Sequence, residues 1–290
     1  MIRDVYSLIR VRQWTKNLLC FGGLFISRTV HWDAASLLGA ALAFAAFCLA
    51  ASSVYVFNDL HDAPRDRIHP RKRSRPIASG RVGPAAAWLL IALLAGGSLA
   101  VGVAGGPHLL ACIGLYLLIN IVYTLRLKTV PIIDVFCISA GFLLRLLAGI
   151  YAIGDQPTSW VVLCTLFITL FVGFAKRRSE LATHAESDSQ RPVLARYSLD
   201  YLDMLINASA TMAVVMYALF TTSSGRDPSL AVTVLPVVFA VFRYQHILMI
   251  GAGAEEPDRV LLSDAGIRWA MVVWLLSFYA ISRLSPGLFL

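Results

Sequence analysis

Apolar segments of about 20 residues recur along the whole chain, and they decide which folds it can adopt. Of the 290 residues, 58% are hydrophobic and only 14% are charged, whereas soluble domains carry about 25% charged residues. A helix needs about 20 apolar residues to cross a bilayer, and the short alternating segments of membrane β-barrels do not dominate here. We therefore expect an all-α, polytopic membrane protein that forms one transmembrane domain over residues 1–290.

Nine segments are candidate transmembrane helices. They cover residues 17–31, 35–57, 84–104, 108–125, 131–152, 159–175, 203–222, 229–249 and 267–285. The basic segment before the first of them lacks a convincing cleavage site, so we expect it to be retained as a short helix on the membrane surface. The five cysteines all lie in apolar runs without a C-x-x-C pair, which is typical of small buried side chains.

The lysine and arginine residues predict the orientation of the chain. With the N-terminus inside, most of these 25 residues fall in inner segments, and the outer segments hold only Arg28, Arg226 and Arg283. Cytoplasmic loops carry such an excess of cations. We therefore expect a multi-pass protein of the inner (cytoplasmic) membrane, with its N-terminus and its charge-rich loops facing the cytoplasm. The net charge of +8 then reflects topology, and we expect no nucleic-acid partner.

The most informative polar segment directly follows an apolar one. Asn58, Asp62 and Asp66 are spaced by four residues and would share one face of a helix. Oxygen ligands in this arrangement suit Mg²⁺, which binds through one or two carboxylates plus substrate phosphates. Pro64 predicts that the helix ends or kinks near Ala63, which would place Asp66 in the next element. An ordinary polar loop with internal ion pairs is the alternative.

Cations follow these carboxylates within a few residues. Lys72, Arg73 and Arg75 lie in a basic segment that begins and ends with proline. Arginine offers a planar fork to phosphate oxygens and lysine offers a point charge. The positive-inside rule alone would also explain the cluster. Because the cations adjoin the carboxylates, we favour a site for chemistry on a diphosphate at the membrane surface.

One apolar segment contains two ionisable residues. Asp134 and Arg145 are eleven residues apart, which puts them on one face of a helix about 16 Å apart, too far for an ion pair. Gly141 lies on the same stripe. Ionisable side chains inside a membrane usually face a cavity or a partner. We therefore expect both residues to line one cavity.

Other polar residues near the predicted inner face are candidates for contacts with a phosphate or a lipid headgroup. They are Lys16, Asn17, Tyr123, Arg126, Lys128, Lys176 and Arg177. Local explanations stay open for several of them. Arg126 and Lys128 would also reach lipid headgroups from a helix end, and Lys176 would also pair with Glu180 four residues later.

The chain resembles the UbiA superfamily of intramembrane prenyltransferases. The first aspartate-rich motif of the superfamily, N-D-x-x-D-x-x-x-D, matches residues 58–66. Within the superfamily the chain is most similar to the decaprenyl-phosphate phosphoribosyltransferases. The similar segments are residues 12–17, 66–80, 123–128, 134–145 and 175–180. Members that use prenyl diphosphates carry a second D-x-x-x-D motif, whereas here Asp134 is followed by Ile138, so the second motif is halved.

The resemblance implies about nine helices around a central cavity open to the bilayer. It also implies transfer of a 5-phosphoribosyl group from phosphoribosyl diphosphate to a polyprenyl phosphate. On this interpretation Asn58, Asp62 and Asp66 hold Mg²⁺, and Asp62, Asp66 and Asp134 are the catalytic candidates. The residues that would bind substrate are Lys16, Asn17, Lys72, Arg73, Arg75, Tyr123, Arg126, Lys128, Arg145, Lys176 and Arg177.

Two alternatives stay open. One is a prenyltransferase with an aromatic or haem acceptor, and the other is a non-catalytic carrier of a lipid phosphate or membrane partner. The sequence also leaves open whether the chain forms a homo-oligomer.

Overall fold

The structure is a computed structural model that describes residues 2–27, 32–70, 72–183, 192–223, 226–250, 260 and 263–284. Within these ranges the regular structure is entirely helical, which confirms the expected all-α class. Eight helices of the described part are long and apolar enough to cross a membrane. The chain forms two compact units. The first comprises Met1–Val130 and Ala140–Pro157, and the second comprises Pro131–Ser139 and Thr158–Leu290.

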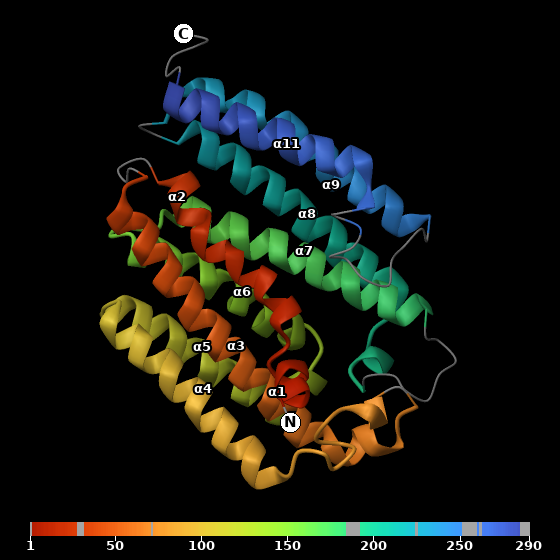
Figure 1. Ribbon diagram of the computed structural model, residues 1–290. Helices are drawn as coiled ribbons and strands as arrows, with labels where there is room; N and C mark the ends of the chain where they lie inside the picture. Colours follow the sequence, from red (N-terminus) through yellow and green to blue (C-terminus); the bar gives the residue numbers. More distant parts are fainter. Residues whose placement is uncertain are drawn as a thin grey trace. The chain divides into compact units, whose positions relative to one another are not determined.

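The first unit contains most of the polar segments singled out above. Its elements are α1 (Ile2–Ile9), the 3₁₀ helix η1 (Val11–Phe21), α2 (Gly22–Ile26), α3 (Ala34–Ile68), η2 (Lys72–Ser74), α4 (Pro84–Ala104), α5 (Pro107–Leu125), η3 (Leu127–Thr129) and most of α6 (Ile133–Ala152). Helix α3 packs against both α4 and α5, and α4 also contacts α5 (Figure 1). The long helix α3 therefore carries both apolar core residues and the polar segment that begins at Asn58.

Small residues let the helices of the first unit approach closely. The core around α3 is rich in alanine, including Ala43, Ala46 and Ala50. A Cβ atom added at Gly149 of α6 would lie 1.8 Å from the carbonyl oxygen of Cys20. Helices in membranes associate through such backbone contacts between small residues. The absence of a side chain at position 149 therefore sets how close α6 lies to η1.

Replacing Gly149 by alanine is expected to destabilise the protein by about 1–3 kcal/mol, because the new methyl group would overlap backbone atoms that cannot move freely. Gly114→Ala is the matched control, since a Cβ at Gly114 would have no neighbour within 4 Å. In the control, the better helix propensity of alanine should leave stability unchanged or slightly higher. Thermal unfolding in detergent measures both variants, and equal unfolding temperatures would contradict the close contact.

The sequence predicted that Pro64 would place Asp66 in the element after α3. This prediction is wrong, because Asp66 belongs to α3. Helix α3 runs through Pro64 and ends at Ile68, and the backbone oxygen of Asp66 accepts a hydrogen bond from His69. A proline inside a helix removes one backbone hydrogen bond, and other contacts can compensate when the chain is packed. Here Ala63 is buried and Asp66 is paired with Arg75, so tertiary contacts hold the last turn of the helix.

The N-terminal region differs from the predicted first span. Residues 17–27 form the end of η1 and the short helix α2, and the rest of that predicted span lies outside the described residues. The expected short helix at the start of the chain is confirmed as α1. Leu8 of α1 is fully buried against Val56 and Ile77. Helix α1 therefore packs against the rest of the first unit through its apolar side.

The second unit is built around one apolar core. Its elements are the start of α6, α7 (Ser159–Thr183), η4 (Leu194–Arg196), α8 (Leu199–Thr222), η5 (Pro228–Thr233), α9 (Val234–Met249), α11 (Ala265–Tyr279) and η6 (Ala280–Leu284). Helix α7 packs against α8, and α9 packs against α11. Val135, Phe171 and Leu202 belong to the buried cluster that joins these elements.

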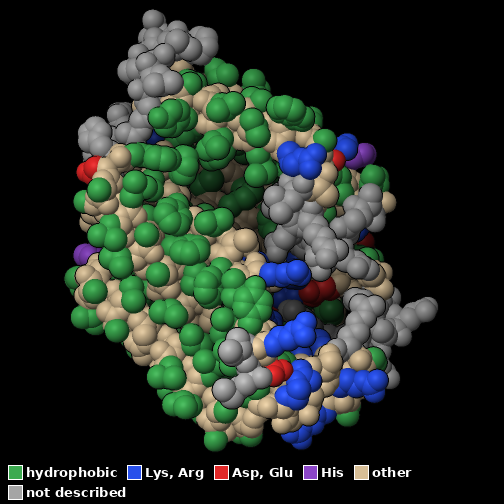
Figure 2. Space-filling model, in the orientation of Figure 1, with side chains coloured by type: hydrophobic (Ala, Val, Ile, Leu, Met, Phe, Trp, Pro, Cys, Tyr) green, Lys and Arg blue, Asp and Glu red, His purple; other side chains and the backbone are tan. Residues whose placement is uncertain are grey.

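Much of the apolar surface of the protein is exposed. On α4, the side chains of Trp88, Leu89, Leu93 and Val103 are more than half exposed. Hydrophobic side chains cover most of the face shown in Figure 2, and many of the visible lysine and arginine side chains gather where Figure 1 draws the segment between α3 and α4. Large exposed apolar areas mark contact with a membrane or a partner, which agrees with the eight candidate spans.

Candidate active site

The polar residues at the end of α3 lie on two neighbouring faces of the helix. Each step of four residues turns by about 40° around the helix axis, so Asp66 lies about 80° from Asn58 but only about 20° from Asp59. Asn58 and Asp62 contact the end of α5 and η3. The carboxylates of Asp59 and Asp66 contact arginines instead. The four-residue spacing therefore does not bring all three predicted metal ligands into one set of contacts.

The first face offers oxygen atoms that are partly open to solvent. The side-chain oxygen of Asn58 accepts a hydrogen bond from the Thr124 hydroxyl. One oxygen of Asp62 accepts from the ammonium group of Lys128 at 2.7 Å, and about a third of the Asp62 side chain is exposed. Lys128 is thus an ion-pair partner of Asp62, an interaction between two predicted site residues that lie 66 positions apart in the sequence.

On the second face, two buried carboxylates alternate with two partly exposed arginines. Arg10 donates to Asp59 at 2.5 Å, and Arg75 donates to Asp59 at 3.0 Å and to Asp66 at 2.7 Å. Both carboxylates are only 4% exposed, and buried carboxylates require such partners. In this arrangement Asp66 holds Arg75 in place through one carboxylate oxygen, so a metal-ligand role for Asp66 would depend on its other oxygen.

The basic segment after α3 extends into solvent. Lys72 and Arg73 lie on η2 with exposed side chains, and Arg71 lies outside the described residues. Arg75 is the member of the cluster that turns back toward α3, and it is about one-third exposed. The three predicted phosphate-binding residues therefore differ, because Arg75 is fixed by two carboxylates whereas Lys72 and Arg73 lie on the surface.

Arg145 occupies a buried polar site inside the first unit. Its guanidinium donates to the side-chain oxygen of Asn17 at 2.7 Å, to the Gly141 carbonyl at 2.6 Å and to the Tyr116 hydroxyl at 3.0 Å. It also lies over the ring of Tyr116, 4.7 Å from the centroid. No carboxylate pairs with it in the described part of the chain, so ring electrons and neutral oxygens stabilise the charge. Two predicted substrate-binding residues, Asn17 and Arg145, thus bind each other.

Asp134 is the centre of a separate buried cluster in the second unit. Its carboxylate accepts from Arg177 at 2.7 Å and from the Tyr197 hydroxyl at 2.9 Å, and both Asp134 and Arg177 are almost fully buried. Arg177 also donates to Glu180 at 2.6 Å. Burial raises the pKa of the Tyr197 phenol, so this hydroxyl stays protonated and donates. The expectation that Asp134 and Arg145 line one cavity stays a prediction.

The backbone just before Asp134 is strained. Ile132 has a φ of +69°, a conformation that is a rare outlier for a β-branched residue. Its N–H donates to the Tyr197 hydroxyl at 2.5 Å, so one phenol fixes both the strained turn and the carboxylate. Strained residues of this kind concentrate at functional sites.

The remaining predicted site residues are spread over η1, the end of α5 and the second half of α7. Lys16 on η1, Tyr123 at the end of α5 and Lys176 on α7 are half-buried, and Arg126 is exposed just after α5. Glu180 pairs with Arg177.

The sequence interpretation assigned no contact to four residues that complete these sites. They are Arg10, Tyr116, Thr124 and Tyr197. Each of them contacts a polar residue far away in the sequence, so local periodicity gives no signal for the contact. A signal was available only for Arg10, as a cation beside a predicted membrane surface.

The comparison with protein families decides what kind of protein this is. Residues 17–272 match the model of the UbiA prenyltransferase family. The chain belongs to the UbiA family. It is therefore a membrane-embedded transferase of this family, which confirms the resemblance noted in the sequence and the expected fold class.

Curated relatives within the UbiA family are similar over most of their length. The decaprenyl-phosphate phosphoribosyltransferase of Mycolicibacterium smegmatis is 32% identical over 95% of this chain and 91% of its own. The protein of the same name from Corynebacterium glutamicum is also 32% identical, over 92% of this chain and 83% of its own. Among solved structures, a UbiA homologue from Archaeoglobus fulgidus bound to GPP and Mg²⁺ has a TM-score of 0.74 at 18% identity, covering 96% of this chain and 99% of that one.

The donor atoms on the first face of α3 fit a divalent cation. In the described part of the chain, no group of three or more His, Cys, Asp and Glu residues is arranged to hold a metal. Mg²⁺, however, is usually bound by one or two carboxylates, with waters and substrate phosphates completing its shell. Asn58 and Asp62 supply two hard oxygen donors one helical turn apart, and Asp62 is accessible. This pair therefore fits a Mg²⁺ site that a diphosphate would complete.

Proposed function

We propose that this UbiA-family protein transfers the 5-phosphoribosyl group of phosphoribosyl diphosphate to a polyprenyl phosphate and releases diphosphate. The reaction depends on Mg²⁺ and takes place at the cytoplasmic face of the inner membrane, where the positive-inside rule puts the basic loops. The observation that carries the proposal is the halved second motif. The single carboxylate left in it, Asp134, is buried and bound by Arg177 and Tyr197. The named relatives support the same assignment.

The reaction exchanges one bond at the anomeric carbon of the ribose. An oxygen of the lipid phosphate attacks this carbon, and the carbon–oxygen bond to diphosphate breaks with its electron pair leaving on the diphosphate. We propose inversion at this carbon. A phosphate monoester is largely ionised near pH 7, so the nucleophile needs no general base.

The residues at the end of α3 bind the diphosphate. Mg²⁺ held by Asn58 and Asp62 would neutralise charge on the departing group. Arg75, fixed by Asp59 and Asp66, offers a preorganised donor to phosphate oxygens, and preorganised donors stabilise charge that develops in a transition state. When Asp62 turns to the metal, the ammonium group of Lys128 becomes available to a phosphate.

Lys72 and Arg73 are exposed and serve the initial capture of the donor. Lys16 and Lys176 are the remaining candidates for the lipid phosphate. Asp134 acts through the groups it fixes, because Arg177 and Tyr197 occupy its two oxygens. Arg177 in turn is fixed by two carboxylates, so its proposed role is to position the residues around it.

One assay distinguishes the proposed reaction from its alternatives. Purified protein in lipid vesicles is incubated with Mg²⁺, a polyprenyl phosphate and ribose-labelled phosphoribosyl diphosphate, and the lipid is then extracted. We expect label in the lipid fraction, and none when EDTA removes the metal. Transfer from a prenyl diphosphate to an aromatic or haem acceptor, without ribose label, would instead establish a prenyltransferase. Retention of polyprenyl phosphate with no transfer from either donor would establish a carrier.

A further inference from the structure

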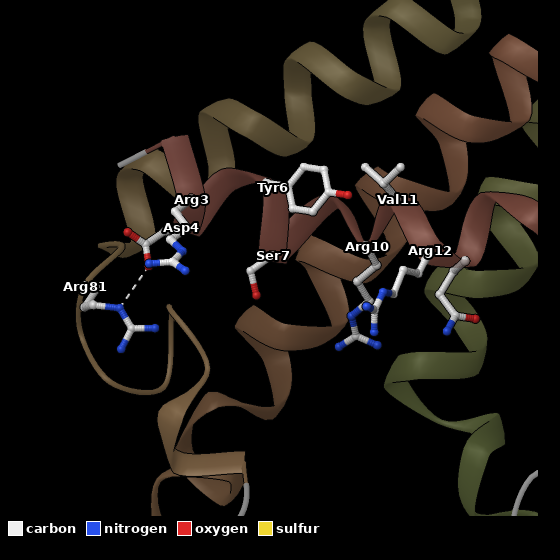
Figure 3. Close-up of a pocket in the computed structure, with 9 residues that line it drawn as sticks. Arg3, Asp4, Tyr6, Ser7, Arg10, Val11, Arg12 and Arg81 are labelled. Carbon is white, nitrogen blue, oxygen red and sulfur yellow. Dashed lines mark hydrogen bonds and ion pairs between the residues drawn. The ribbon is translucent and has the colours of Figure 1, made fainter.

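A basic pocket of about 670 Å³ lies at the N-terminal end of the first unit (Figure 3). Pockets for small ligands typically measure about 300–1,000 Å³. The wall is formed by α1, the start of η1 and Arg81. Its charged residues are Arg3, Asp4, Arg10, Arg12 and Arg81. We call this hollow the arginine pocket.

The positive charge of the arginine pocket exceeds the negative charge around it. Arg81 donates to Asp4 at 2.9 Å, which lowers the pKa of that carboxyl, and Arg10 donates to Asp59. Arg3 and Arg12 have no hydrogen-bond or ion-pair partner for their side chains in the described part of the chain. Two guanidinium groups on the wall of one hollow thus lack a described partner, and a bound anion would offset this excess positive charge.

Arg10 is held rigidly at the edge of the pocket. Its backbone has a φ of +50°, a left-handed conformation that is unfavourable for a residue with a side chain and persists only where the surroundings enforce it. Its guanidinium lies 5.0 Å from the centre of the Tyr55 ring and binds Asp59. A guanidinium has five N–H donors, so Arg10 can keep Asp59 and still donate to an anion in the pocket.

The surroundings of the pocket favour an anion that is attached to a lipid. Tyr6 lines the pocket and is 59% exposed, and tyrosine is enriched at membrane interfaces. From the pocket, η1 continues directly into an apolar segment in which Leu18 is 55% exposed. A phosphate held by Arg12 would therefore lie where exposed apolar side chains begin.

We propose that the arginine pocket binds the phosphate of an isoprenyl phosphomonoester, the acceptor in the proposed transfer. The proposal rests on the proposed function for the identity of the acceptor, but not for the pocket itself. Figure 3 draws Arg12 beside Arg10 at one end of the pocket and Arg3 beside Asp4 and Arg81 at the other. The fork of Arg12 matches the oxygens of a phosphate, and Arg3 adds positive charge to the same hollow. A monoester carries more negative charge than the diester of a bulk phospholipid. The acceptor thus has a site at α1 in addition to Lys16 and Lys176, the candidates for its phosphate during the transfer.

Binding without any donor tests this inference. Farnesyl phosphate is titrated onto the full chain in detergent, and its Kd is measured for the wild type and for the double variant Arg3→Gln/Arg12→Gln. We expect the Kd of the double variant to rise at least tenfold, because each lost side chain makes charge-assisted hydrogen bonds. Among the described residues, neither arginine side chain has a partner that would be left unpaired, so the unfolding temperature should stay unchanged. An unchanged Kd overturns the proposal.

Matched variants separate a specific pocket from general electrostatics. Arg196→Gln/Arg268→Gln removes the same charge from exposed positions of the second unit and should leave the Kd unchanged, and an equal rise there would refute a specific site. Arg3→Lys/Arg12→Lys keeps the charges that orient the N-terminus but loses the planar fork. We expect an intermediate Kd for it. A Kd equal to that of the wild type would overturn recognition through the planar guanidinium fork.

Three further probes identify the ligand. Farnesol and inorganic phosphate should bind more weakly than farnesyl phosphate by at least tenfold. Phosphatidylglycerol is the third probe. If it binds as tightly as farnesyl phosphate, and if the glutamine double variant loses this binding, the pocket binds bulk lipid headgroups and the acceptor assignment is overturned.

The pocket and the proposed function can fail separately. If the wild type binds farnesyl phosphate through Arg3 and Arg12 but transfers no ribose label, the proposed function fails and the pocket stands. If transfer proceeds and the KM for the lipid is the same in the glutamine variant, the pocket proposal fails and the function stands.

Discussion

Replacing Asp62 by asparagine is expected to lower the rate of phosphoribosyl transfer by about 10²- to 10³-fold, the loss typical of one removed electrostatic contact to a developing charge. Asp62 is the accessible carboxylate at the end of α3, since Asp59 and Asp66 are buried against arginines. An amide in its place keeps the shape of the side chain but loses the charge that binds the metal. The measurement is the initial rate of ribose label entering the lipid, at a series of Mg²⁺ concentrations.

The Mg²⁺ dependence distinguishes a metal ligand from a structural residue. In the Asp62→Asn variant, half-maximal activity should require a higher Mg²⁺ concentration, which loss of the Lys128 ion pair alone would not cause. Asp200→Asn is the matched control, because Asp200 is exposed in the first turn of α8 and should keep wild-type activity. Wild-type rates and an unchanged Mg²⁺ requirement in Asp62→Asn would exclude the proposed metal site.

Replacing Arg177 by methionine is expected to destabilise the protein by about 3–5 kcal/mol, the usual loss when one partner of a buried ion pair is removed. Arg177 is 1% exposed and binds both Asp134 and Glu180. Methionine would leave the Asp134 charge buried with the Tyr197 hydroxyl as its remaining described partner. The measurement is the midpoint of thermal or denaturant unfolding in detergent.

The neighbouring arginine provides the control for this prediction. Arg178 forms an ion pair with Asp203 in which both side chains are partly exposed, and such pairs contribute about 1 kcal/mol or less. Arg178→Met should therefore cost much less than Arg177→Met. Adding Asp134→Asn to Arg177→Met should recover part of the loss, because it removes the unpaired charge. Equal losses of stability in Arg177→Met and Arg178→Met would show that burial does not make the Asp134–Arg177 ion pair more important for stability than the partly exposed pair.

The helices could be predicted from the sequence because a membrane leaves few alternatives. In hydrocarbon every backbone polar group must be satisfied within the structure, so long apolar runs become helices. Their ends were predicted less well. The segment 35–57 belongs to α3, which continues to Ile68, and the segment 159–175 belongs to α7, which continues to Thr183. Hydropathy marks where a helix leaves the apolar region, whereas ion pairs such as that of Asp66 with Arg75 hold the polar turns beyond it.

The candidate site was predictable as a set of residue types but not as a set of contacts. Regular spacing correctly indicated that Asn58 and Asp62 are neighbours on one helix, since that depends only on helical geometry. The partners of these residues come from other elements, as with Lys128 and Thr124. Such contacts depend on how helices pack, and a single sequence carries no record of which distant residues meet.

Because the exterior of α4 is apolar, its exposed positions should tolerate polar substitutions poorly, unlike exposed positions of a water-soluble protein. In a water-soluble protein, an exposed position such as Leu93 would accept lysine at little cost. In a bilayer, a lysine near the middle of a helix costs about 3 kcal/mol, whereas small buried residues facing another helix are constrained by shape alone. Sequence variation in relatives of this chain should therefore concentrate on exchanges among leucine, valine, isoleucine and phenylalanine at outward positions, and surface engineering for solubility would work against insertion.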